Sequence, residues 1–162
     1  MESKKTPRLW DISPPVHEGA PVFPGDTPYR QRWAATIAPG CPVNVSEITL
    51  SPHVGSHADA PLHYDEHGAT IGAVSLVPFL GRCRVIHAID CGPLLEWRHV
   101  EHAVQDLPPR VLLRTYRHMP VDRWDPHLSA YAPGTIERLA DLGVQLVGID
   151  TASIDPADSK TL

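Results

Sequence analysis

Proline constrains this chain more than any other residue type. The 162 residues include 18 prolines, about 11% of the chain against roughly 5% in an average protein. They are scattered along the sequence without a repeating period. Because proline lacks a backbone N–H and disrupts helix interiors, this distribution predicts many turns and edge segments. It excludes a helical bundle, a coiled coil and a collagen-like repeat.

The remaining composition is typical of one folded domain. Hydrophobic residues make up 42% of the chain and charged residues 20%, which is enough apolar material for a core. We therefore expect a single domain over residues 1–162. The formal net charge is −5, and Lys4-Lys5 is the only basic cluster. Because nucleic-acid-binding proteins usually carry a basic patch, we expect no nucleic-acid partner.

The cysteines and the N-terminal residues indicate a cytoplasmic protein. The three cysteines are odd in number and contain no CxxC pair, which favours a reducing compartment. The N-terminal segment is charged and lacks the apolar stretch of a secretory signal. No apolar run approaches the roughly 18 residues of a membrane helix. We expect no membrane partner.

The sequence pattern predicts a mixed α/β fold in which strands dominate. Alternating and β-branched residues predict strands at 8–13, 43–50, 82–90, 110–115 and 144–149. Helical periodicity predicts helices at 97–106 and 135–142, the second ending at Gly143. Residues 52–68 are expected to form a structured loop. The apolar segment 70–80 is ambiguous, although Pro78 argues against a long helix.

Four of the ten histidines fall between residues 53 and 67, at His53, His57, His63 and His67. The first two are four residues apart, a spacing that pairs two side chains on a helix. Val54 nevertheless stands where the zinc-protease helix motif HExxH requires glutamate. Nearby prolines and a glycine also argue against a helix. We therefore expect these imidazoles to be brought together by a tight loop.

A metal site is the strongest interpretation of this loop. Two imidazoles, from His53 and His57, and the carboxylate of Asp59 form a three-ligand set that leaves a position for water, as in catalytic zinc sites. His63 is a further imidazole, whose unperturbed pKa of about 6.5 suits acid–base catalysis. The alternative is that these histidines are ordinary polar surface residues. His67 either extends the cluster or belongs to a solvated loop.

Other polar residues have two interpretations each. Cys41 is either a nucleophile or soft ligand, or a buried structural thiol. Asn44 and Ser46 alternate on a predicted strand just before the histidines and are candidates to face the site. Asp150 and Ser153 follow a buried strand, where sites on open sheets often lie. Asp150 is alternatively a cap for the turn that follows it.

The segment from His53 to His63 resembles the HxGTHxDxPxH signature of the metal-dependent cyclase family, with Ser56 in place of the usual threonine. Further segments resemble the bacterial kynurenine formamidases within that family. They are residues 10–13, 24–28, 40–45 and 148–151, the last followed by Ser153, Asp155 and Pro156. The resemblance extends from Trp10 to Leu162.

The resemblance implies a swivelling β/β/α domain and a homodimer. The implied activity is that of a zinc-dependent arylformamidase, the hydrolysis of N-formyl-L-kynurenine to L-kynurenine and formate in tryptophan catabolism. Other cyclase-family hydrolases act on different amides or on cyclic esters, and this alternative stays open. A further alternative is a catalytically inert metal-binding fragment.

The resemblance also implies the roles of individual residues. His53, His57 and Asp59 would be metal ligands, with Asp59 bridging two zinc ions; manganese or cobalt can occupy similar N/O sites. His63 would be the proton donor and acceptor. Phe23 stands where the family usually has a substrate-contacting tryptophan, so it keeps an aromatic face for the substrate but lacks the indole N–H.

The resemblance breaks at the end of the sequence. Family members continue past the position of Leu162, and a histidine and a glutamate in that region complete their two-metal site. We therefore expect a cyclase-type domain that lacks its C-terminal part. Asp59 would be the one certain ligand of a second metal ion.

Overall fold

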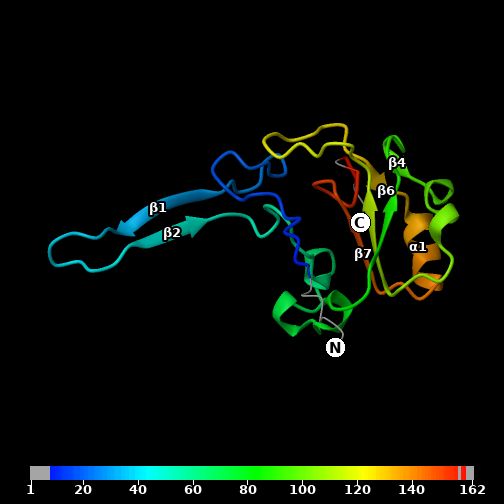
Figure 1. Ribbon diagram of the computed structural model, residues 1–162, viewed down its shortest axis with the longest axis horizontal. Coiled ribbons are helices and arrows are strands. Elements are labelled where there is room, and N and C mark those ends of the chain that lie inside the picture. Colours follow the sequence, from blue (N-terminus) through cyan, green and yellow to red (C-terminus); the bar gives the residue numbers. More distant parts are fainter. Residues whose placement is uncertain (1–7, 157, 160–162) are drawn as a thin grey trace, which may run out of the picture.

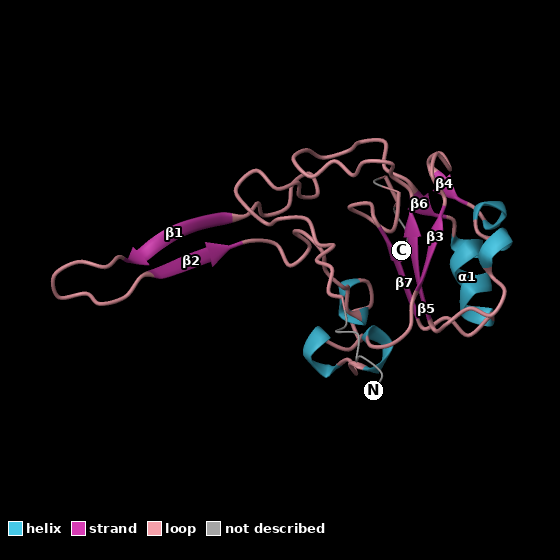
Figure 2. Cartoon of the chain, in the orientation of Figure 1, coloured by secondary structure: helices cyan, strands magenta, loops and turns pink. Residues whose placement is uncertain are grey.

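The computed structural model describes residues 8–156 and 158–159. The charged N-terminal start, including Lys4-Lys5, and the last three residues of the predicted domain lie outside the described residues. Among the described residues the fold is mixed α/β and rich in strands, as predicted (Figure 2). No described helix has the length and apolar character needed to cross a membrane.

A three-stranded parallel sheet forms the centre of the domain. Its strands are β3 (Arg84–His87), β5 (Arg110–Arg114) and β7 (Leu146–Ile149), in the order β3-β5-β7. The predicted strands at 82–90, 110–115 and 144–149 are confirmed in shortened form. Helix α1 (Pro133–Asp141) lies beside this sheet (Figure 1).

The core lies between the sheet and α1. Ile86, Val111 and Leu113 are almost fully buried and pack in one cluster with Leu139 of α1. Because side chains alternate across a strand, the residue between two buried ones faces the other way, and Leu112 between Val111 and Leu113 is only half-buried. The same alternation leaves Val85 exposed beside the buried Ile86.

The predicted helix at 135–142 is confirmed, although it starts two residues earlier. Pro133 occupies its first turn, where the missing proline N–H costs nothing. Beyond the helix end, Gly143 has φ +84° and donates a hydrogen bond to the carbonyl of Ala140. A left-handed residue in this place is the usual stop signal for a helix.

The predicted single helix at 97–106 is wrong. Two short 3₁₀ turns replace it, η4 (Trp97–His99) and η5 (Glu101–Ala103). Val100 between them has φ −121°, outside the helical range, and is completely buried in the core. Packing of Val100 therefore interrupts the helical path that the periodicity predicts.

The predicted strand at 8–13 is also wrong. These residues form no strand, and Leu9 and Ile12 are more than four-fifths exposed. The ambiguous segment 70–80 forms two further 3₁₀ turns, η2 (Ile71–Ala73) and η3 (Val77–Phe79). The predicted loop at 52–68 is confirmed, and it contains the 3₁₀ turn η1 (Pro61–His63).

An antiparallel hairpin projects from this body as an arm (Figure 1). It consists of β1 (Arg30–Ala35), which sequence reasoning missed, and β2 (Val45–Thr49), which confirms the predicted strand at 43–50. Two very short strands, β4 (Leu94–Leu95) and β6 (Ala130–Tyr131), pair in parallel near α1.

We expect Leu139→Ala to lower the free energy of unfolding by about 2–5 kcal/mol, because it leaves a cavity between α1 and the sheet. Leu139 is 0% exposed, whereas Leu142 at the end of the same helix is 50% exposed. Leu142→Ala is therefore the matched control, with an expected change of about 0.5 kcal/mol or less. Urea unfolding followed by circular dichroism measures both variants. Equal losses would contradict the placement of the core.

Candidate metal centre

The loop that follows β2 changes direction sharply between Ser51 and Gly55. The N–H of Val54 donates to the carbonyl of Ser51, and Gly55 has φ +74°. A Cβ atom at Gly55 would lie 2.6 Å from Cγ2 of Val16, so both the backbone angle and the close contact require glycine. This turn lets His53 and His57 approach each other without a helix.

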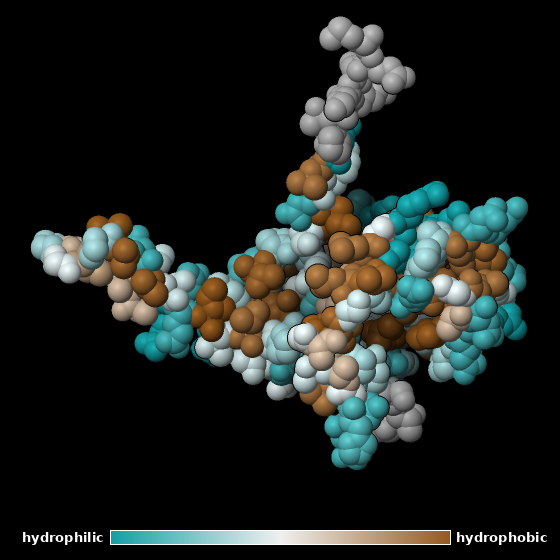
Figure 3. Space-filling view, turned by 90° about the horizontal axis from the view of Figure 1, so that it is seen from below, coloured by the Kyte–Doolittle hydropathy of each residue, from teal (hydrophilic) through white to brown (hydrophobic). Residues whose placement is uncertain are grey.

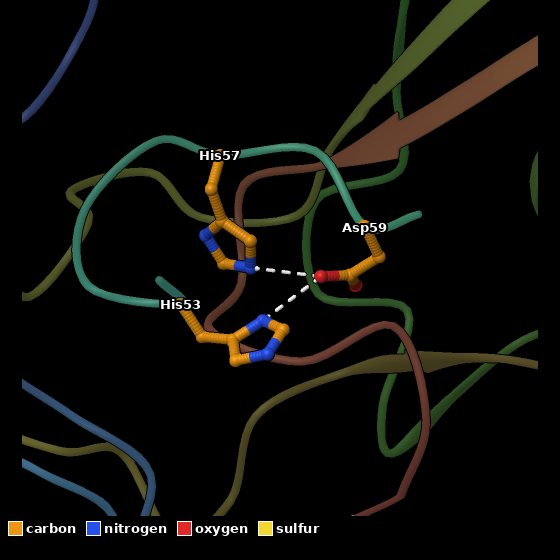
Figure 4. Close-up of side chains that lie close together, drawn as sticks. All are labelled: His53, His57 and Asp59. Atoms are coloured by element: carbon orange, nitrogen blue, oxygen red, sulfur yellow. Dashed lines mark ion pairs between the residues drawn. The ribbon is translucent and has the colours of Figure 1, made fainter. Parts of the chain in front are cut away.

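Three side chains of this loop converge (Figure 4). Nδ1 of His53 lies 2.9 Å from Oδ1 of Asp59, and Nε2 of His57 lies 3.5 Å from the same oxygen. Their potential ligand atoms all lie within 4.8 Å of one another. Each side chain is about one quarter exposed, at 27%, 25% and 29% respectively. The site is thus partly shielded and still open to a small molecule.

The hydrogen bond of His57 shows why this cluster fits a cation. Nδ1 of His57 lies 2.9 Å from the carbonyl oxygen of Gly55, and a carbonyl can only accept, so Nδ1 carries the proton. In the neutral ring Nε2 then presents a lone pair to the carboxylate of Asp59. Two acceptors facing each other favour a cation between them. A backbone carbonyl that holds the other ring nitrogen is also common among metal-binding histidines.

His63 lies beside this cluster, at the end of η1. Its ring centroid is 4.2 Å from that of His53, and the ring of Tyr64 contacts it edge-on at 6.1 Å. The loop that carries it is closed by Gly68, where a Cβ would lie 2.4 Å from the backbone of Pro61. His63 is exposed, so it can exchange protons with solvent or with a bound molecule.

Phe23 lies on a turn beside the histidines. The N–H of Asp26 donates to the carbonyl of Phe23, which closes the turn. The hydroxyl of Ser51, two residues before His53, donates to Asp26, so this turn lies next to the loop that carries the histidines. The Phe23 ring is 41% exposed and meets the edge of Trp124 at 5.2 Å. Sequence reasoning missed Trp124, because no periodicity or motif links a lone aromatic in a loop to Phe23.

Asp26 is anchored by two hydrogen bonds. Oδ2 accepts the hydroxyl of Ser51 at 2.5 Å, and Oδ1 accepts the backbone N–H of Thr27 at 2.7 Å. The bond from Ser51, followed by the bond from Thr27, holds the pKa of Asp26 below its usual value. Asp26 is therefore a carboxylate at neutral pH. Sequence reasoning gave this residue no role of its own.

The structure does not bring several other candidates to the site. Asn44 accepts a hydrogen bond from the N–H of Ile37 within the tip of the hairpin, and Ser46 pairs with Trp33 in the same hairpin, so neither candidate lies in the cluster. The thiol of Cys41 donates to the carbonyl of Val43 in the same tip, which supports a structural role. His67 is 86% exposed, which confirms the solvated interpretation.

Asp150 connects two strand ends and does not cap its own turn. Its Oδ1 accepts the N–H and the hydroxyl of Thr115, and Oδ2 accepts the N–H of Tyr116. Within the 151–153 turn, the side-chain hydrogen bond comes from Thr151, whose hydroxyl donates to the carbonyl of Ser153. Asp150 therefore joins the segments that follow β5 and β7. It also lines a small cavity of about 30 Å³ with Trp124.

Comparison with known proteins places the chain in a family. Residues 10–156 match the Cyclase family model, and the chain belongs to this family. Two solved structures share its fold at 26% and 25% identity, with TM-scores of 0.73 and 0.74 over 93% of this chain. One is described as a "potential metal-dependent hydrolase with cyclase activity", and the other as a "predicted metal-dependent hydrolase" from Bacillus stearothermophilus. The chain covers 71% and 72% of them.

The similar curated proteins carry a more particular name. The kynurenine formamidase of Paracidovorax citrulli is 71% identical over 97% of this chain, and that of Bordetella pertussis is 68% identical over 96%. The aligned region spans 75% and 74% of those two proteins. The resemblance read from the motif and its flanking segments is thereby confirmed.

We expect Tyr116→Phe to raise the pKa of Asp125 toward its ordinary value of 3.8. The Tyr116 hydroxyl donates to Asp125 at 2.7 Å, and this bond is the main cause of the lowered pKa. A lowered pKa in the folded state stabilises the protein above pH 3.8 and ceases to do so as the pH falls through the lowered value. On acidification below pH 4, the free energy of unfolding should therefore fall less in the variant than in the unmodified protein.

Carboxyl-carbon NMR titration measures this pKa directly. Tyr29→Phe is the control, because the Tyr29 hydroxyl donates to Gln31 and not to a carboxylate. An unchanged pKa of Asp125 in Tyr116→Phe would contradict the hydrogen bond.

Proposed function

We propose that this chain hydrolyses N-formyl-L-kynurenine to L-kynurenine and formate, a step in tryptophan catabolism. The observation that carries the proposal is the convergence of His53, His57 and Asp59 beside the exposed imidazole of His63. The identity to the kynurenine formamidases supports this choice of substrate within the family.

We assign His53, His57 and Asp59 as the metal ligands, through the nitrogen and oxygen atoms that already face one another. Two imidazole nitrogens and a carboxylate oxygen are a donor set that suits zinc, with manganese and cobalt as alternatives. When bound, the metal supplies Lewis acidity toward a carbonyl oxygen and toward water. In a form with two ions, Asp59 would bridge them.

His63 is the proposed proton donor and acceptor. Hydrolysis consumes one water and breaks the bond between the formyl carbon and the arylamine nitrogen. That nitrogen must gain a proton as it leaves. The exposed His63 ring lies next to His53, and an imidazole titrates near neutral pH. It can therefore take a proton from water and deliver it to the leaving amine.

Phe23 is the proposed contact for the aryl ring of the substrate. Its ring is partly exposed, and its orientation is restrained by the edge-on contact with Trp124. An offset or edge-to-face contact between aromatic rings contributes about 0.5–1.5 kcal/mol beyond area burial. Phe23 thus supplies apolar contact without a hydrogen bond.

We also propose a homodimer in which the hairpin arm is covered by a second copy. Gln31 pairs with Ile48 and Trp33 with Ser46, so these four side chains share one face, while Arg32 and Glu47 pair on the other. Trp33 and Ile48 are 60% and 51% exposed. Figure 3 shows apolar side chains along this arm. An isolated two-stranded hairpin is marginally stable, so a partner over this face would stabilise it.

The reaction is assigned to the cytoplasm. Cys41, Cys83 and Cys91 are all free thiols, which accords with a reducing compartment.

We expect His63→Asn to lower kcat for N-formylkynurenine by about 100-fold or more, since a positioned acid–base group contributes at least about that factor. Zinc content should be unchanged, because His63 is not an assigned ligand. His67→Asn is the matched control on the same loop, with an 86% exposed side chain, and should keep full activity. The assay follows kynurenine absorbance, and metal analysis of the same samples gives the zinc content.

Removal of the metal by a chelator should abolish turnover, and added zinc should restore it. Chelator-resistant turnover would refute the metal-dependent reaction. If the folded, zinc-loaded chain cleaves another amide or a cyclic ester but not N-formylkynurenine, the substrate assignment is wrong. A folded chain that binds zinc and hydrolyses none of these would be an inert metal-binding domain.

We expect Ile48→Lys to shift the chain from dimer to monomer, because it places a charge on the apolar face of the arm. Thr49→Lys is the matched control, since Thr49 pairs with Arg30 on the polar face. Light scattering coupled to size-exclusion chromatography measures the mass of each. A dimer that persists in Ile48→Lys, or a wild-type monomer, would contradict the proposed interface.

A further inference from the structure

The start of the histidine loop is held by one buried hydroxyl. Ser51 is 4% exposed, and its Oγ makes two hydrogen bonds, donating to Oδ2 of Asp26 at 2.5 Å and accepting the backbone N–H of His53 at 3.2 Å. The backbone N–H of Ser51 also donates to the carbonyl of Thr27. The loop is thus attached to the 23–27 turn at the residue two positions before the first assigned ligand.

The direction of these bonds follows from the groups involved. The backbone N–H of His53 can only donate, so it uses a lone pair of the Ser51 oxygen. A carboxylate can only accept, so the single hydroxyl proton of Ser51 must point to Asp26. The result is a chain of two bonds from His53 through Ser51 to Asp26. The bond to Asp26 involves an ionised acceptor, a class that is roughly twice as strong as a neutral pair.

The turn that presents Asp26 is itself well defined by the sequence. Pro24 and Gly25 occupy its two central positions, and Gly25 has φ +93°. Proline followed by a residue of positive φ is the preference of a type II turn. The second carboxylate oxygen is fixed by the N–H of Thr27. Asp26 therefore reaches Ser51 from a rigid support, with its carboxylate already oriented.

We propose that Asp26 is a positioning residue that orients His53 for metal binding through the hydroxyl of Ser51, a role that rests on the metal site of the proposed function. Asp26 does not touch the ligand atoms. It fixes the backbone of His53, and hence the direction from which Nδ1 faces Asp59. Partners of metal ligands typically change metal affinity by about 10- to 100-fold when removed. Because these two hydrogen bonds act on the backbone of His53 and not on its ring, we expect the lower end of that range.

The test measures zinc affinity by competition with a chromophoric chelator, using the full chain in its folded, metal-free form. Asp26→Ala and Ser51→Ala should each weaken zinc binding by about tenfold. The double variant should be no weaker than either single variant, because both changes break the same chain of bonds. Circular dichroism and urea unfolding of the metal-free variants separate lost affinity from lost folding.

Asp65→Ala is the matched control. Asp65 accepts the N–H of His67 in a similar short-range bond on the same loop, but it lies outside the chain from Asp26 to His53. The Asp65→Ala variant should bind zinc with the affinity of the unmodified protein. Unchanged affinity in folded Asp26→Ala, or additive losses in the double variant, would overturn the positioning role. Failure of the unmodified chain to bind zinc would instead refute the proposed function itself.

Discussion

The candidate metal centre depends on the anchoring of a loop that has almost no regular secondary structure. Between β2 and η1 the backbone is held by single contacts, above all by the buried hydroxyl of Ser51 and the close approach of Gly55 to Val16. In a strand, loss of one hydrogen bond leaves neighbouring bonds in place. In this loop each contact stands alone, so the positions of His53 and Asp59 rest on a few particular residues.

A second set of contacts connects the core with the aromatic side of the site. The parallel sheet is fixed by burial against α1, and Asp150 ties the ends of β5 and β7 together through Thr115 and Tyr116. The segment after Tyr116 then carries Trp124 to the ring of Phe23. Residues distant in sequence therefore meet at the carboxyl ends of parallel strands, where binding sites on open sheets commonly lie.

Local sequence patterns predicted part of this fold. The strands β3, β5 and β7 were predictable because each is a short, mainly apolar run, and α1 because its apolar residues recur at helical spacing and are followed by Gly143. The helix expected at 97–106 did not form, because Val100 is buried in the core with a backbone angle outside the helical range. The strand expected at 8–13 did not form because no described strand pairs with this segment. A sequence pattern typical of a strand forms one only where a second strand supplies the hydrogen bonds. The strand β1 escaped notice because it is stabilised by pairing with β2 alone.

The sequence by itself determined the family and the candidates for metal binding and acid–base chemistry, because a short motif places His53, His57, Asp59 and His63 within eleven residues. Such proximity is a property of the chain and needs no folding to be recognised. Tertiary structure alone decided which atoms face one another, that Asp26 reaches the histidine loop through Ser51, and that Trp124 meets Phe23. The Asp26–Ser51 and Phe23–Trp124 contacts join residues 25 and 101 positions apart, and no local sequence pattern can specify contacts across such separations.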